Sequence, residues 1–148
     1  MSATQPPARP APVDQPYAGA RLGLPPQGRG SVVGWGRRFA ALFVDWVASM
    51  LVAASIAGRG VLTGHGWETW LPMGVFLVES TVLVPLVAGS FGQLLLRIAV
   101  VRVDRSPVTV LHALLRTVLI CAVVPPVIYN RDRRGLHDLV TGTVTVRR

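Results

Sequence analysis

At 148 residues the chain is long enough for one domain and a tail. About half of its residues are apolar (51%) and only 15% are charged, whereas soluble domains carry about 25% charged residues. The net charge of +8 comes from arginine alone, and no basic helix face with interleaved aromatic residues appears, which argues against a nucleic-acid-binding protein. Basic flanks of a membrane protein explain the charge better, because cytoplasmic flanks collect Lys and Arg.

The first 33 residues differ in composition from the rest of the chain. They contain seven of the twelve prolines and almost no large apolar side chains. Such a segment buries too little surface to offset its ordering entropy, so we expect residues 1–33 to be a disordered, Pro-rich cytoplasmic tail. The membrane domain would then cover residues 34–148. The tail lacks the apolar core of a cleavable signal peptide, so insertion would use the first spanning helix itself.

Two apolar stretches, Phe39–Ala57 and Leu71–Gly89, run for nineteen residues each. A helix needs about 20 mostly apolar residues to cross a bilayer, so both stretches are predicted to be transmembrane helices. Each carries one acidic residue, Asp45 in the first and Glu79 in the second. Pro85 is expected to kink the second helix.

The third apolar stretch, Val108–Tyr129, is ambiguous because Pro125 and Pro126 should break its helix. Arginines gather before residue 39, between residues 90 and 107, and after residue 129, which places all three segments in the cytoplasm under the positive-inside rule. Three full crossings cannot satisfy that arrangement. Either the C-terminus lies outside despite its charge, or the third stretch is re-entrant and does not cross.

Two β-branched segments, Ile98–Val103 and Thr143–Val146, are typical of short strands. If they pair, both lie on the same side of the membrane, which favours the re-entrant alternative. The predicted fold is therefore an all-α integral membrane protein with two firm spans, a third broken or re-entrant helix, and a small cytoplasmic strand pair.

Ionisable residues inside the apolar stretches are the candidate functional positions, because a charge in the bilayer usually faces a partner or a wet cavity. His112 and Arg116 are four residues apart and share a helix face. The arrangement of lowest energy would pair Arg116 with Asp45 or with Glu79. Two interpretations remain open: internal ion pairs that hold the helices in register, or an ion or proton pathway built on the carboxylates.

Enzyme chemistry finds no support in the sequence. No nucleophile–base arrangement, phosphate-binding loop or metal-ligand spacing appears, and a single cysteine, Cys121, allows no intrachain disulfide. We therefore expect no catalytic residues, no metal and no cofactor.

Four segments in series resemble the RDD family, which is named for one Arg and two Asp. They begin with Arg38 to Asp45, continue with Phe91-Gly92-Gln93 and Leu114-Leu115-Arg116, and end with Arg134-Gly135-Leu136-His137-Asp138 followed by Thr141 to Val144. The resemblance covers about residues 35 to 147 and implies that Arg38, Asp45 and Asp138 are the three named residues. The chain departs from the family pattern at Leu94 and Leu96, where Thr and Gly are usual. The resemblance implies a small bacterial multi-pass membrane domain, with transport suggested only in general terms.

Independently of the resemblance, Asp138 follows several arginines in a segment predicted to lie at the membrane surface. We expect it to pair with Arg97 or Arg38 and so to clamp this segment onto the helices. The thin bundle also predicts a homo-oligomer or a partner membrane subunit, in a cell membrane with the N-terminus in the cytoplasm. Two functions follow from these features: a transport or ion-exchange component, or a non-transporting scaffold that recruits partners through its tail.

Overall fold

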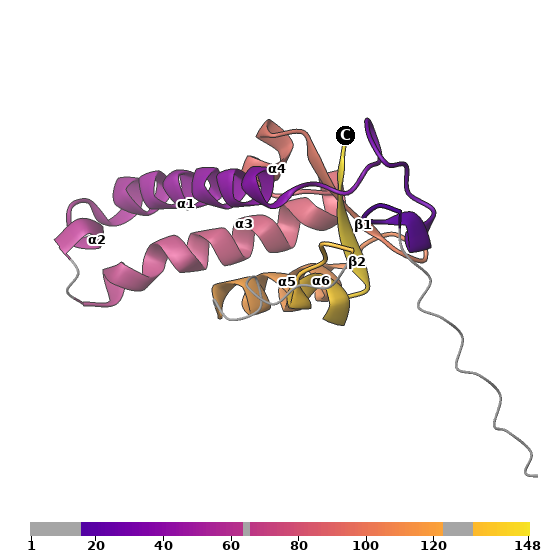
Figure 1. The fold of residues 1–148 in the computed structure, drawn as a ribbon. Coiled ribbons are helices and arrows are strands. Elements are labelled where there is room, and N and C mark those ends of the chain that lie inside the picture. Colours follow the sequence, from indigo (N-terminus) through magenta and orange to yellow (C-terminus); the bar gives the residue numbers. More distant parts are fainter. Residues whose placement is uncertain (1–15, 64–65, 123–131) are drawn as a thin grey trace, which may run out of the picture.

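Two long helices lie side by side, and a small sheet lies at one end of them (Figure 1). A computed structural model describes residues 16–63, 66–122 and 132–148. The long helices are α1 (Trp35–Ala57) and α3 (Leu71–Val87). The short helices α2 (Gly60–Thr63) and η2 (Trp67–Trp70) lie between them in sequence, at the end remote from the sheet.

The facing sides of α1 and α3 are formed by every fourth residue. The buried residues are Ala41, Asp45, Ser49 and Ala53 on α1, and Pro72, Phe76, Ser80 and Val84 on α3. A spacing of four places these residues on one helix face, and the small side chains of α1 let the two backbones approach closely, as in membrane helix pairs.

Both long helices have the length and composition to cross a membrane. The candidate spans are Trp35–Ala57 and Trp67–Val87, and only 22% of the most apolar window in each is buried in the protein. Large apolar side chains such as Phe43 (68% exposed) and Leu86 (73% exposed) cover the outer faces. A core helix of a soluble protein would bury such residues, so a hydrocarbon surrounding fits these helices better than water. The two predicted spans are thus present as apolar helices of sufficient length.

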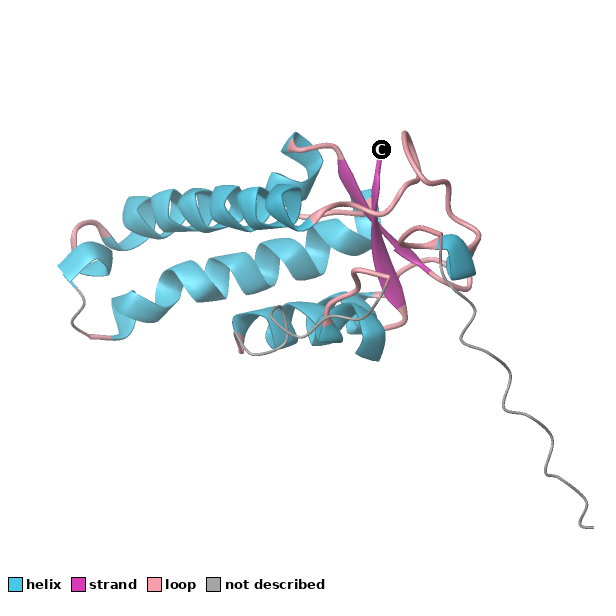
Figure 2. Ribbon diagram, viewed as in Figure 1, coloured by secondary structure: helices cyan, strands magenta, loops and turns pink. Residues whose placement is uncertain are grey.

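The predicted strand pair is confirmed. Strands β1 (Ile98–Arg102) and β2 (Thr143–Arg147) are antiparallel, with Val100 opposite Thr145 (Figure 2). Most of their residues are buried, and Ile98, Val100, Val144 and Thr145 are each at most 1% exposed. The sheet therefore forms part of the buried core at this end of the molecule.

Residues 16–33 form an ordered arm, which differs from the tail predicted from composition. The arm contains the short helix η1 (Ala20–Leu22) and forms a β-bridge between Val32 and Val146. Val33 is fully buried and its amide donates to the Thr145 carbonyl. The few apolar residues of the arm gain a sheet edge to pack on, so tertiary burial offsets their ordering entropy. Residues 1–15 lie outside the described part of the chain.

The third apolar stretch contributes only one short helix, α5 (Val110–Cys121), within the described residues. Its 12 residues span about 18 Å, well below the bilayer core of roughly 30 Å. Residues 123–131, with both predicted helix-breaking prolines, lie outside the described residues. Two further short helices lie near the sheet, α4 (Phe91–Leu95) before β1 and α6 (Leu136–Val140) before β2.

Candidate functional site

The carboxylate of Asp138 lies at the centre of a buried polar cluster. It is the third residue of α6 and is completely inaccessible to solvent. Its Oδ2 accepts a hydrogen bond from Arg38 at 3.0 Å, and its Oδ1 accepts from Arg116 at 3.1 Å and from the Thr143 hydroxyl at 3.1 Å. Three different elements, α1, α5 and β2, therefore donate to one carboxylate.

Arg38 enters this cluster from the first turn of α1. Its Nε donates to the Val33 carbonyl at 3.2 Å, and its guanidinium carbon lies 5.4 Å from the centroid of the Trp35 ring. Because the side chain is held by a carbonyl, an aromatic face and a carboxylate at once, its geometry is tightly determined. The expected pairing of Asp138 with Arg38 is confirmed, while Arg97 does not take this role.

The predicted partner of Arg116 is wrong. The sequence suggested Asp45 or Glu79, whereas Arg116 forms its ion pair with Asp138. The carboxylates of Asp45 and Glu79 instead bind the backbone of α4, and α6 brings Asp138 to the buried face of α5. Arg116 is only 4% exposed, so an unpaired charge there would be costly.

Electrostatics keep Asp138 ionised and its neighbour His137 neutral. Burial alone would raise the pKa of Asp138, but the charges of Arg116 and Arg38 outweigh it and hold that pKa below its usual value. Burial lowers the pKa of His137 to about 4. The contact of 3.5 Å between Nε2 of His137 and Oδ1 of Asp138 is therefore not an ion pair at neutral pH.

Asp45 lies in the middle of α1 and holds the start of α4. Its Oδ1 accepts from the Gly92 amide at 2.5 Å, and its Oδ2 accepts from the Ser90 hydroxyl at 2.6 Å. Gly92 is required at this point because a Cβ there would overlap the Ala41 carbonyl oxygen of α1. The close approach of α4 to α1 thus depends on a glycine and a carboxylate together.

Glu79 reaches the same turn of α4 from the opposite long helix. Its Oε1 accepts from the Phe91 amide at 2.6 Å, and its Oε2 accepts from the Ser80 hydroxyl at 3.3 Å. The remaining amide of this turn, that of Ser90, donates to Oε1 of Gln93 at 3.0 Å. Three consecutive amides of a short helix are therefore satisfied by side chains, two of them by carboxylates from α1 and α3.

His112 does not join either cluster. Its Nδ1 lies 2.6 Å from the hydroxyl of Thr109, the residue that precedes α5. Although His112 and Arg116 lie one turn apart, only Arg116 is buried against the rest of the domain. Among the residues that the structure describes, no group of three His, Cys, Asp or Glu side chains has the arrangement of a metal site.

A cavity of about 60 Å³ lies beside the Asp138 cluster. Its lining includes Arg38, His137 and Thr145, whose Nη2, Nδ1 and Oγ1 atoms are buried and have no hydrogen-bond partner among the described residues. The cavity is lined mostly by apolar surface but is large enough for ordered water, which could accept from the arginine and donate to the imidazole.

Several residues of the site carried no individual prediction. Arg134 donates to the carbonyls of Thr143 and Asp138, at 2.9 and 3.0 Å, and so joins α6 to β2. Ser90 and Thr143 each bind a signature aspartate. Short polar side chains have many roles, and only the sequence resemblance at Arg134 and Thr143 gave a signal.

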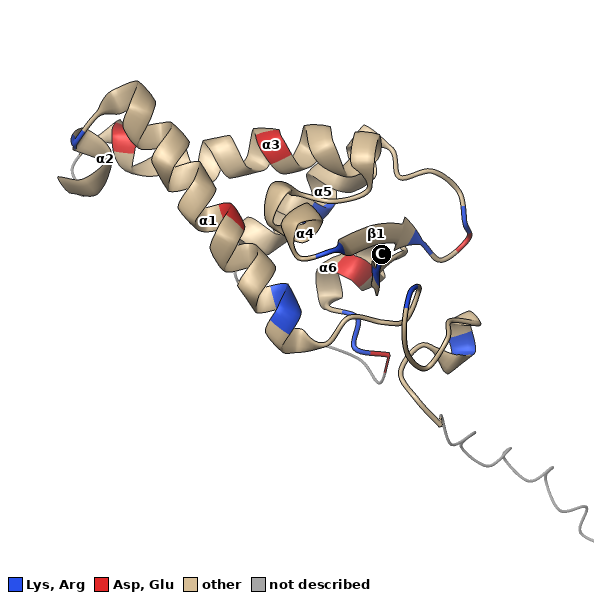
Figure 3. Ribbon diagram, turned by 90° about the horizontal axis from the view of Figure 1, so that it is seen from above, with Lys and Arg blue, Asp and Glu red and all other residues tan. Residues whose placement is uncertain are grey.

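The charged residues are distributed unevenly over the molecule (Figure 3). Acidic residues lie within α1, α3 and α6, while most of the arginines surround the sheet end. Two apolar helices of membrane-spanning length, closed at one end by a strand pair and a buried Arg–Asp–Arg cluster, define a small helical membrane-associated domain.

The model of the RDD family matches residues 32–142, a range that includes Arg38, Asp45 and Asp138. The chain therefore belongs to the RDD family, as its sequence motifs indicated. No curated protein and no solved structure matches the chain.

Proposed function

We propose that this protein is a component of a proton- or cation-coupled exchange system in a cell membrane, with its N-terminus in the cytoplasm. The observation that supports this function is the convergence of Asp45 and Glu79, from two helices of membrane-spanning length, on adjacent amides of one turn of α4. Carboxylates at membrane depth are expensive, and they commonly mark ion or proton pathways.

The two carboxylates accept from adjacent amides of one turn, so their negative charges lie near each other. A bound proton or monovalent cation would relieve the repulsion between two negative charges, and its release would restore it. The amides of Phe91 and Gly92 stabilise whichever carboxylate is charged, in the manner of the broken helices that hold ions in secondary transporters. Arg116, bound to Asp138, leaves both carboxylates available for this role.

A second candidate function is a non-transporting scaffold or partner-recruiting subunit. The closed Asp138 cluster favours the scaffold, because Arg38 and Arg116 form ion pairs inside the protein. In either case the exposed apolar faces of α1 and α3 suit a homo-oligomer or a partner membrane subunit, which would complete a bundle of only two long helices.

Neutralising the carboxylates tests the exchange function. Asp45→Asn and Glu79→Gln retain an oxygen that accepts from α4 but remove the charge. In vesicles that contain the protein and a lumenal pH dye, an imposed Na⁺ or K⁺ gradient should change the lumenal pH, and each variant should reduce the initial rate at least tenfold.

Asp104→Asn provides the matched control, because Asp104 is an exposed carboxylate in the loop after β1. This variant should retain the rate of the unaltered protein. Equal rates in all proteins and in empty vesicles would contradict exchange and favour the scaffold.

A further inference from the structure

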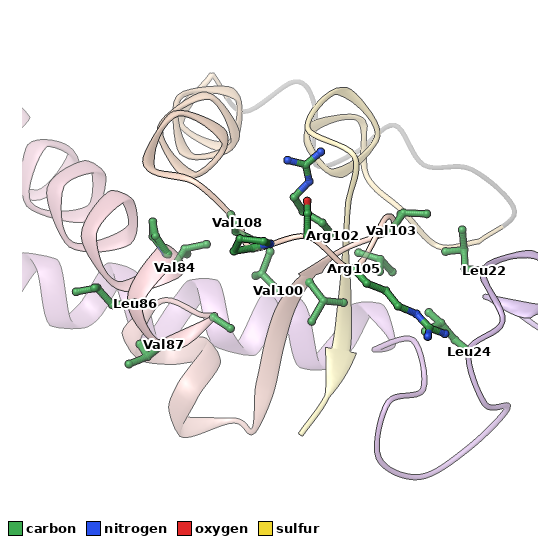
Figure 4. Close-up of a pocket in the computed structure, with 16 residues that line it drawn as sticks. Leu22, Leu24, Val84, Leu86, Val87, Val100, Arg102, Val103, Arg105 and Val108 are labelled. Carbon is green, nitrogen blue, oxygen red and sulfur yellow. The ribbon is translucent and has the colours of Figure 1, made fainter.

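A groove lies where α3 ends, between that helix, β1 and the loop that leads to α5. Its volume is about 650 Å³. Figure 4 shows the α3 side chains Val84, Leu86 and Val87 on one side and Leu22 and Leu24 of the arm on the other. Arg102 and Arg105 extend from the segment between these two walls.

One wall of the groove continues into the outer surface of a candidate membrane span. Leu86 is 73% exposed, and Val82 and Val78, one and two turns earlier on α3, are also exposed. An apolar chain that lies along this face of α3 would therefore pass from the surrounding hydrocarbon into the groove without crossing a polar rim.

Beside its apolar walls, the groove carries an excess of positive charge. Asp104 pairs with Arg102 at 2.7 Å. Arg105 has no side-chain partner within the described ranges, and Arg148 adds a further positive charge where it donates to the Val87 carbonyl. The backbone of Arg105 has a φ of 60°, a left-handed conformation that costs a non-glycine residue energy and directs its side chain from a tight turn.

An apolar wall beside an excess of positive charge matches an amphipathic ligand with an anionic head and an apolar tail. The groove volume lies within the range of about 300–1,000 Å³ that is usual for small-molecule sites, enough for a headgroup and the start of an acyl chain. Basic pockets beside membrane helices on the cytoplasmic side select anionic lipids, because that leaflet carries them.

We propose that this groove binds one anionic phospholipid, with the phosphate at Arg105 and the first part of an acyl chain against Leu86 and Val87. The site depends on the membrane location of the protein but not on ion exchange. A protein without flux activity would still bind the lipid.

Lipid retention tests the proposal directly. The full-length protein in a zwitterionic detergent is mixed with equal amounts of short-chain phosphatidylglycerol and phosphatidylcholine, and native mass spectrometry counts the bound lipids. We expect one phosphatidylglycerol to be retained in preference to phosphatidylcholine. Arg105→Gln should weaken phosphatidylglycerol binding about fivefold, the usual contribution of one arginine near an anionic membrane surface.

Arg59→Gln is the matched control, since Arg59 is equally exposed but lies at the far end of α1. It should leave binding unchanged. Leu86→Gln, on the exposed apolar wall, should also weaken binding, whereas glycerol 3-phosphate at the same concentration should not displace the lipid. Equal retention of both lipids, equal binding by the two arginine variants, an unchanged Leu86→Gln variant, or displacement by glycerol 3-phosphate would each overturn the proposal.

Discussion

At the scale of single residues, Asp138 determines how the parts of the domain are held together. Its carboxylate joins Arg38 of α1, Arg116 of α5 and Thr143 of β2, and no solvent reaches it. Two buried arginines share this one negative charge. The resemblance named Asp138 and Arg38, but it did not indicate that Arg116 belongs to the same cluster.

Removing the charge of Asp138 should destabilise the protein strongly. In Asp138→Asn, Arg38 and Arg116 remain buried without a counter-charge, and the loss of one partner of such a cluster costs about 3–5 kcal/mol. Thermal unfolding in detergent should show a clearly lower midpoint. Asp104→Asn, which breaks an exposed ion pair, should leave the midpoint unchanged, and equal effects of both variants would contradict the central role of Asp138.

The lowered pKa of His137 predicts that the protein loses stability on mild acidification. The unfolded chain protonates this residue near its usual pKa of 6.5, whereas the folded protein does so only near 4. The unfolded state therefore binds more protons between these values, and the free energy of unfolding falls by about 2–3 kcal/mol as the pH drops from 6.5 to 4. The lowered pKa of Asp138 adds a further loss at still lower pH.

Unfolding midpoints measured from pH 7.5 to 4.5 check this expectation. His137→Gln should flatten the curve in that window, and His112→Gln, at a histidine that lies outside the Asp138 cluster, provides the comparison. A curve with the same slope in the His137 variant would assign the pH dependence to other groups.

At the scale of elements, the long helices and the strand pair follow from local pattern, while α4 does not. Phe91–Leu95 is too short to be recognised by periodicity, and its first amides are satisfied by Asp45 and Glu79, which lie 47 and 12 residues away from their partners. The same contacts explain why the expected pairing of Arg116 was wrong. The carboxylates of Asp45 and Glu79 accept hydrogen bonds from the backbone of α4, a helix that no sequence pattern predicted.

Two other elements show the limits of composition. Proline and glycine predicted disorder up to residue 33, yet Val32 and Val33 add to the sheet and lie in its core. The third apolar stretch forms the helix α5 from Val110 to Cys121, and the break expected at Pro125 and Pro126 lies outside the described residues. Pro85 lies in the last turn of α3, where the helix ends at Val87 in any case.

At the scale of the whole molecule, both ends of the described chain meet at the sheet. The Gly30 amide donates to the Arg147 carbonyl, and Val32 bridges Val146. The N-terminal arm, β1 and β2 therefore lie on one side of any membrane that α1 and α3 cross, which is the side where the arginines gather. If α1 and α3 cross a membrane, this arrangement fits two crossings and does not fit three.

Accessibility labelling tests the two-crossing topology. In a Cys121→Ser background, single cysteines at Ser2 and after Arg148 should react with a membrane-impermeant thiol reagent only from the cytoplasmic side. A cysteine at Thr63, exposed at the far end of the helices, should react only from outside. Opposite sides for the two termini would require a third crossing and would contradict the topology.

The length and apolar character of α1 and α3, the positions of the two strands and the family motifs were determined by the sequence itself, because each depends on residues that are neighbours in the chain. A long apolar run or a β-branched segment has a preferred local structure wherever it is placed. The partners of the charged side chains were decided only by the tertiary structure. Burial makes every unpaired charge expensive, so the choice among Asp45, Glu79 and Asp138 depended on which backbone and side-chain donors the folded chain brought within reach.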